Sequence, residues 1–303
     1  MKKEKKIKKE FLCVNGLYRT GSGALLDFLK GYENLNVIED EFQIFRGSFV
    51  PLLSKIANGE DFTQEEFEEV KREWLNYGKS QNKISFIFNK FKKPRYKRRG
   101  YNKIFPGYWN ITEEMFNELE NARNQEDLKE IFEKYFYKLF LDAGIENEKP
   151  VFNQLIKSTD PFVCSLLPSL KTIIVFRDPR DHFCEILTRK EADQKFKEKD
   201  RAKSFVEEYS DRYNRAENFI KDSSGQAMKI RFEDLIFDQE GVREKIENFV
   251  DIGGPFRKEL SAFDKNVSSK NTRIFEKHKF DEEIELIEEK LSDWLYKFPE
   301  EDI

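Results

Sequence analysis

Five short apolar runs, several of them rich in β-branched residues, alternate along the chain with longer amphipathic stretches. Runs of this kind predict strands at 11–14, 35–38, 151–154, 171–176 and 228–232. Apolar residues at helical spacing predict helices over 125–143 and 201–221, and a last one that Asp281 caps and that runs to about 295. Strands that alternate with helices indicate an α/β fold, with a central, mainly parallel sheet flanked by helices.

A glycine-rich loop follows the first predicted strand. Residues 16–23 read GLYRTGSG, and the helical pattern after them stops at Gly31. A loop between a strand and a helix directs backbone N–H groups and the positive helix end at an anion, and Arg19 adds a fixed cation. An ordinary glycine-rich turn is the alternative. Ser22 and Gly23 stand where a nucleotide-hydrolysing P-loop needs Lys and Ser or Thr, which argues against a Mg-nucleotide hydrolase.

A second basic turn follows the strand predicted at 171–176. It reads Arg177-Asp178-Pro179-Arg180-Asp181 and leads into a helix that we expect to reach about residue 190. Ligand contacts in parallel α/β sheets lie at the carboxyl ends of strands, where Arg177 stands. A capped turn with a structural Arg–Asp pair is the alternative.

Composition narrows the class of protein. The chain has 303 residues with 30 Phe and 11 Tyr, which is typical of a folded protein with a large core, and we expect one domain over 11–300. A net charge of −4 argues against general nucleic-acid binding. Three scattered cysteines and two histidines argue against a disulfide framework and a multi-histidine metal centre. Without an apolar run that could span a bilayer, we expect a cytoplasmic protein, with a flexible lysine-rich tail at 1–10.

Residues 74–112 contain no acidic side chain, although the chain as a whole has more acids than bases. Lysines and arginines alternate there with aromatic residues and create a local positive field. Such a segment suits an anionic acceptor with rings, because cations pair with its acid groups and aromatic faces contact its rings. The alternative is a solvated basic loop, or one that associates peripherally with an anionic membrane.

Three segments together resemble the sulfotransferases that use 3′-phosphoadenosine 5′-phosphosulfate (PAPS). Residues 16–26 are similar to that family's 5′-phosphosulfate loop, whose core is G-x-x-[RK]-[ST]-G-[ST], and residues 173–181 are similar to its 3′-phosphate motif. Residues 231–235, which read RFEDL, resemble a downstream family signature. The three occur in family order and spacing, and the chain most resembles bacterial-type carbohydrate sulfotransferases.

The resemblance implies a PAPS donor, adenosine 3′,5′-bisphosphate (PAP) as product, no metal, and in-line transfer of a sulfonyl group to a hydroxyl or amine. It implies that Arg19 contacts the bridging and 5′-phosphate oxygens and acts in catalysis, because a fixed cation stabilises charge on the leaving oxygen. Arg177 would pair with the 3′-phosphate. The other expected donor-binding residues are Thr20, Gly21, Ser22, Gly23, Ala24, Lys270 and Arg273.

The acceptor must lose a proton, which requires a base. Some branches of the family place a glutamate after the second strand, and among Glu39, Asp40 and Glu41 we predict Glu41. A solvated turn of carboxylates is the alternative. His182 directly follows the 3′-phosphate motif, away from the family's histidine bases, and we expect it to be a residue of the helix start.

One residue departs from the family pattern. Glu185 stands eight residues after Arg177, where the family has a serine on the 3′-phosphate. Either Glu185 turns away and Thr188, Lys270 or Arg273 replaces the serine, or the donor carries no 3′-phosphate. A carboxylate beside a phosphate is repulsive unless Arg189, one helical turn further on, neutralises it.

The expected acceptor is an anionic carbohydrate or glycan precursor. The resemblance places its recognition in the insertion that this family commonly carries between the second and third strands, here at 74–112. The expected substrate-binding residues are Lys93, Arg95, Arg98 and Arg99. Two other functions stay open: a kinase-like phosphoryl transferase on the same scaffold, and a non-catalytic domain that binds a nucleotide or polyanion.

Overall fold

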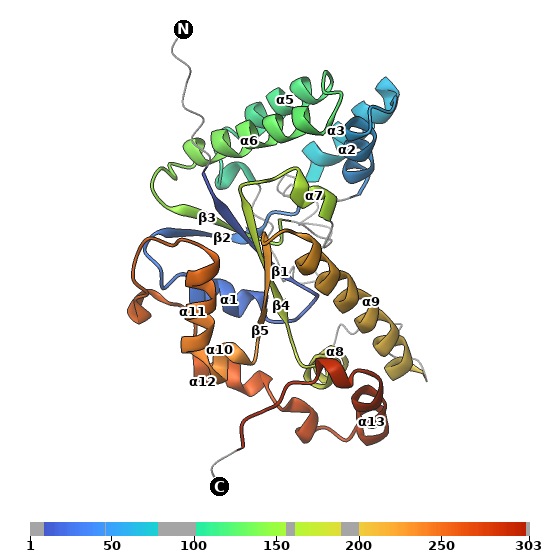
Figure 1. The fold of residues 1–303 in the computed structure, drawn as a ribbon, viewed down its shortest axis with the longest axis vertical. Helices are drawn as coiled ribbons and strands as arrows, with labels where there is room; N and C mark the ends of the chain where they lie inside the picture. The colour runs from blue at the N-terminus through green and yellow to red at the C-terminus, as the bar shows by residue number, and fades with distance from the viewer. Residues whose placement is uncertain (1–8, 46, 78–100, 156–160, 189–199, 301–303) are drawn as a thin grey trace, which may run out of the picture. The chain divides into compact units, whose positions relative to one another are not determined.

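The computed structural model describes residues 9–45, 47–77, 101–155, 161–188 and 200–300, and it has the predicted α/β architecture. Its five strands form one sheet in the order β2-β3-β1-β4-β5 (Figure 1). They are β1 (Phe11–Gly16), β2 (Leu35–Glu41), β3 (Lys149–Asn153), β4 (Leu170–Phe176) and β5 (Ala227–Arg231). Each of the five predicted strands is confirmed, with small differences at the ends.

The helices also follow the predicted pattern. They are α1 (Ser22–Leu29), α2 (Phe49–Ala57), α3 (Gln64–Tyr77), α5 (Tyr108–Leu119), α6 (Gln125–Asp142), α7 (Pro161–Ser165), α8 (Pro179–Thr188), α9 (Arg201–Asp222), α10 (Asp234–Phe237), α11 (Gln239–Phe249), α12 (Lys265–Ser268) and α13 (Asp281–Lys290). The prediction for the last helix was wrong in two respects. Phe280 occupies its N-cap position, so that Asp281 is the first helical residue, and the helix ends at Lys290 before a separate 3-10 turn at Ser292–Trp294.

The chain divides into two compact units. The first comprises Met1–Cys13 and Asn34–Lys171, and the second comprises Val14–Glu33 and Thr172–Ile303. The earlier expectation of one domain over 11–300, with an insertion at 74–112, stays a prediction. At the end of the lysine-rich tail, the Lys9 Nζ donates to the carbonyls of Ile145 (2.5 Å) and Glu146 (3.0 Å).

Phenylalanine dominates the core of the first unit. Phe45, Phe49 and Phe132 are all fully buried or nearly so, and they meet in edge-to-face and tilted ring contacts. The helix α6 runs beside α5 (Figure 1) and begins where the Asn124 side chain accepts two backbone N–H groups. Strands β2 and β3 pair in parallel, with an irregularity between Ile38 and Glu41.

The second unit carries the loop after β1 and the turn after β4. Residues Thr172–Phe176 of β4 pair in parallel with β5, from Thr172 opposite Ala227 to Phe176 opposite Arg231. The long helix α9 packs against β5, α8 and α13 (Figure 1). Both turns that the sequence singled out therefore belong to one compact unit, and their geometry can be described together.

Candidate functional site

The loop after β1 has an unusual backbone. Tyr18 and Arg19 have φ values of 69° and 56°, and Gly21 has a φ of 91°. The Thr20 side chain is fully buried, and its Oγ1 accepts the backbone N–H of Leu17 at 3.0 Å, which closes the loop on itself. Left-handed residues cost about 1–2 kcal/mol each for non-glycine side chains, so two of them in a row are a conformation that the surrounding structure holds in place.

Two glycines of the loop have different surroundings. A Cβ on Gly21 would lie 2.3 Å from Cδ2 of Phe232, so the close approach of this ring requires glycine there as much as the positive φ does. A Cβ on Gly23 would meet nothing within 4 Å among the described residues. The backbone at Gly23, in the first turn of α1, therefore faces open space, where the N–H groups of a helix start lack intrahelical partners.

The Arg177 side chain is buried next to this loop and is only 2% exposed. Its Nη1 donates to the Arg19 carbonyl at 3.1 Å and its Nη2 to the Asn271 carbonyl at 2.6 Å. Nη1 also forms an ion pair with Glu185 of α8. The Nε has no hydrogen-bond partner among the described residues. A buried cationic donor without a partner is costly, and such a group is a feature of binding sites.

The backbone of Arg177 is held by two tyrosines of α9. Tyr209 and Tyr213 both donate their hydroxyls to the Arg177 carbonyl, at 2.7 and 3.1 Å, and Tyr213 accepts the Arg177 N–H at 3.0 Å. Their rings stack with centroids 3.7 Å apart. All three residues are buried, so the position of this arginine at the end of β4 is tightly determined.

The remaining residues of the same turn bind the C-terminal segment. Asp181 accepts the backbone N–H groups of Arg273 (2.8 Å) and Ile274 (2.7 Å), and burial raises its pKa to about 6. Asp178 accepts the Tyr296 N–H at 2.8 Å and pairs with Arg180 at 2.8 Å. The alternative of a structural Arg–Asp pair is thus correct for Arg180 and Asp178.

Glu233, from the third family-like segment, is fully buried behind this turn. Its Oε1 accepts the Asp178 N–H at 2.8 Å, and its Oε2 has no partner among the described residues. Burial raises the pKa of this carboxyl to about 8, so it is largely protonated at neutral pH. It supports the turn from the neighbouring strand end.

His182 lies in α8 and is buried. Burial, helped by the charges of Arg177 and Arg212, lowers its pKa to about 3. The imidazole is therefore neutral at physiological pH and is surrounded by the rings of Tyr18, Phe205 and Tyr209. This agrees with the expectation that His182 is a residue of the helix start.

Glu41 belongs to the first unit, where it ends β2 with an exposed side chain. Its Oε2 accepts from the Gln43 side chain at 2.9 Å, and its carbonyl accepts from the Tyr101 hydroxyl at 3.2 Å. The solvated turn that we weighed as an alternative fits this surrounding as well. Its role as a base stays a prediction.

The other predicted site residues fall into three groups. The Ala24 N–H donates to the Gly21 carbonyl at 3.0 Å, and Ser22 begins α1. Lys270 is exposed, whereas the Arg273 guanidinium contacts the Pro299 carbonyl and lies 5.0 Å from the Phe298 ring centre. The predicted acceptor-binding residues lie outside the described residues: Lys93, Arg95, Arg98 and Arg99.

Glu185 does not turn away from the site, contrary to the first of the two expectations for it. It pairs with Arg177. Arg189, which was expected to neutralise it, lies outside the described residues. Thr188, a suggested replacement for the family serine, donates to the Cys184 carbonyl at 2.8 Å instead. The sequence reasoning missed the two tyrosines of α9, Tyr209 and Tyr213, although their spacing of four residues on a predicted helix was a signal.

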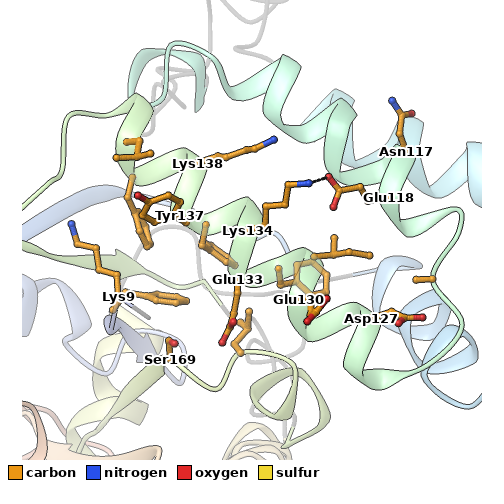
Figure 2. Close-up of a pocket in the computed structure, with 18 of the residues that line it drawn as sticks. Lys9, Asn117, Glu118, Asp127, Glu130, Glu133, Lys134, Tyr137, Lys138 and Ser169 are labelled. Atoms are coloured by element: carbon orange, nitrogen blue, oxygen red, sulfur yellow. Dashed lines mark hydrogen bonds and ion pairs between the residues drawn. The ribbon is translucent and has the colours of Figure 1, made fainter. Parts of the chain in front are cut away.

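A large cavity of about 1060 Å³ lies in the first unit, along α6. Figure 2 shows its lining, in which Lys134 of α6 points toward Glu118 of α5 and forms an ion pair with it. Charges of both signs line it, and none of the predicted site residues does. It does not coincide with the arginine-centred site of the second unit.

Two further properties limit the chemistry of the described residues. Within them, no three His, Cys, Asp or Glu side chains gather as a metal ion would require. Helix length and hydropathy in the same ranges rule out a membrane-spanning helix.

Comparison with known proteins identifies the family. A sequence profile of the sulfotransferase family matches residues 12–258, while a search of curated proteins finds no match. The fold is similar to a sulfotransferase domain from the curacin biosynthetic pathway (15% identity, 96% of this chain and 99% of that one, TM-score 0.47). It is also similar to a sulfotransferase domain from the Synechococcus PCC 7002 olefin synthase (13% identity, 95% of this chain and 95% of that one, TM-score 0.48). A third similar structure is a sulfotransferase from Mycobacterium avium (13% identity, 96% of this chain and 78% of that one, TM-score 0.43). Because the family profile spans most of the chain, including both turns and the RFEDL segment, the chain belongs to the sulfotransferase family.

Proposed function

We propose that this chain is a PAPS-dependent sulfotransferase that binds its donor between the loop after β1 and the turn after β4. The observation that carries the proposal is the buried Arg177. It donates a hydrogen bond to the Arg19 carbonyl of the loop, and its Nε has no partner within the described ranges. PAPS has phosphate groups at both its 5′ and 3′ ends. A loop that suits one anion, joined to a buried arginine that suits another, fits such a molecule.

The residues of the loop support the same donor. The paired left-handed residues Tyr18 and Arg19 lead into the start of α1. A tight loop of this kind at the N-terminus of a helix, where the helix dipole is positive, suits an anion. The open space above Gly23 leaves room for a phosphate against the backbone. The donor supplies an activated sulfonyl group on a phosphate leaving group. Arg19 and the helix start would stabilise charge on that leaving oxygen.

We propose Glu41 as the base that takes the acceptor proton. It stands at the carboxyl end of β2, where α/β enzymes keep catalytic groups, and it is exposed to solvent. The acceptor that we propose is an anionic carbohydrate or glycan precursor. Its support is the acid-free stretch 74–112, of which residues 78–100 lie outside the described residues.

The test measures nucleotide binding and sulfonyl transfer by the purified chain. We expect PAP to stabilise it against heat and ADP with Mg²⁺ not to do so. Arg19→Ala should lower sulfonyl transfer by about 100-fold or more and weaken PAP binding. Arg215→Ala is the control, because this arginine has a 62% exposed side chain and pairs with Asp211, one turn away on α9.

Glu41→Gln should retain PAP binding and abolish transfer to a panel of polysaccharide and lipid-linked acceptors. Transfer at the wild-type rate would remove Glu41 as the base and leave the donor site standing. Stabilisation by ADP with Mg²⁺ alone would instead favour a phosphoryl transferase and contradict the proposed donor.

A further inference from the structure

The ion pair between Arg177 and Glu185 has an unusual position. Arg177 is 2% exposed and Glu185 13%, so both charges are removed from most of the solvent. The pair does not hold two helices together at the surface. It places a carboxylate on Arg177, the buried arginine that joins the loop after β1 to the turn after β4.

The hydrogen bonds of the Arg177 guanidinium show which of its N–H donors the Glu185 carboxylate uses. Nη1 donates to the Glu185 carboxylate and to the Arg19 carbonyl, and Nη2 donates to the Asn271 carbonyl at 2.6 Å. Two of these three partners are neutral carbonyls, and Glu185 is the anion that pairs with the guanidinium within the described part of the chain. A guanidinium pairs equally well with a carboxylate or with a phosphate, through the same planar donors. The two anions would compete for this cation.

We propose that Glu185 is a specificity-determining residue that competes with the donor's 3′-phosphate for Arg177. In the ligand-free protein its carboxylate neutralises the buried cation. When a 3′-phosphorylated nucleotide binds, the phosphate takes the place of the carboxylate. The inference rests on the proposed function, since it assigns the 3′-phosphate to Arg177.

Two opposite effects of removing this charge follow. A ligand-free protein without the carboxylate has a buried arginine with no anionic partner, so it is less stable. The same change removes both the competitor and the repulsion between two anions, so the protein binds the 3′-phosphate more tightly. A residue that merely stabilises the fold gives the first effect without the second.

The experiment uses isothermal calorimetry with PAP and with adenosine 5′-monophosphate, which lacks the 3′-phosphate. Glu185→Gln should bind PAP about ten-fold or more tightly than the wild type and the monophosphate within about two-fold, while its melting temperature without ligand falls. Glu288→Gln is the matched control. Glu288 pairs with the neighbouring Arg180, with 2.9 Å between its Oε1 and the Arg180 Nη1. This variant therefore also removes one negative charge from an arginine of the turn, but it should leave the PAP affinity unchanged.

Each outcome of the calorimetry either supports or overturns the proposed role of Glu185. Unchanged or weaker PAP binding by Glu185→Gln overturns the proposal and makes Glu185 a structural partner of Arg177. Equal gains for both nucleotides, or the same gain in Glu288→Gln, also overturn it, because the effect would then be general electrostatics. If the Gln variant does not fold, Glu185→Ser provides the same comparison with a smaller side chain. A wild type that binds the monophosphate but not PAP contradicts the proposed PAPS donor, and with it the assignment of a 3′-phosphate to Arg177. A wild type that binds neither nucleotide contradicts the proposed function as a whole.

Discussion

Gly21 and Gly23 stand two residues apart in one loop, yet the structure predicts opposite consequences for a methyl group at each. In Gly21→Ala the new Cβ would lie 2.3 Å from Cδ2 and 2.9 Å from Cγ of the Phe232 ring. Its φ of 91° adds about 1–2 kcal/mol of backbone strain, and the overlap with the ring adds about 1–3 kcal/mol. We therefore expect Gly21→Ala to lower the free energy of unfolding by about 2–5 kcal/mol.

Gly23→Ala is the matched control for the fold. Its Cβ meets no described atom within 4 Å, and alanine in a helix is favoured over glycine by about 0.5–1 kcal/mol. Urea unfolding, followed by circular dichroism, should show this variant at or above wild-type stability. The same methyl would fill the space proposed for the donor phosphate, so PAP should bind more weakly while the fold is intact.

The reasoning on Gly21 is refuted if its alanine variant unfolds within about 0.5 kcal/mol of the wild type. A double variant with Phe232→Leu separates the two contributions, because a smaller side chain relieves the overlap and leaves the backbone strain. Non-additivity in that cycle should therefore recover part of the loss.

Two further predictions concern the support of the site. Tyr213→Phe leaves the buried Arg177 N–H without its acceptor and should lower the free energy of unfolding by about 1–3 kcal/mol. Tyr209→Phe should cost less, because the Arg177 carbonyl keeps a second donor in Tyr213. Equal losses of the two variants in urea unfolding would contradict this order. The raised pKa of Glu233, about 8 against an ordinary 4.5, means that the folded state binds a proton that the unfolded state has released, so stability falls as pH rises through this window. Glu233→Gln should remove up to about 1.4 kcal/mol per pH unit of that slope, and an unchanged pH profile would show that Glu233 is ionised in the folded state.

The sequence predicted the elements well where periodicity is strong. The strands and the helices α6 and α9 follow from runs and spacings that no tertiary contact overrides. The end of the last helix was wrong, because Leu291 leaves helical geometry at a point that the apolar pattern does not mark. Short helices such as α10 and α12 depend on tertiary contacts rather than on periodicity, and the pattern did not reveal them.

The site was predictable in its residue types but not in its pairings. Arg19 and Arg177 were singled out from their places after two strands, and the structure joins them through a backbone carbonyl. Local sequence cannot show that Arg273 contacts the Pro299 carbonyl, or that Asn271 approaches Arg177 with its carbonyl. Such contacts link residues distant in sequence, and only the folded chain brings them together.

The anchoring of the C-terminal segment by the turn after β4 has a consequence for synthesis on the ribosome. Arg177 contacts Asn271, which lies 94 residues later in the chain, and Asp178 contacts Tyr296, which lies 118 residues later. During translation the buried arginine therefore emerges well before its last backbone partners, and contacts of such long sequence separation form slowly. Until residue 296 has left the exit tunnel, the turn after β4 lacks these backbone partners, so the donor site that we propose there is complete only near the end of synthesis.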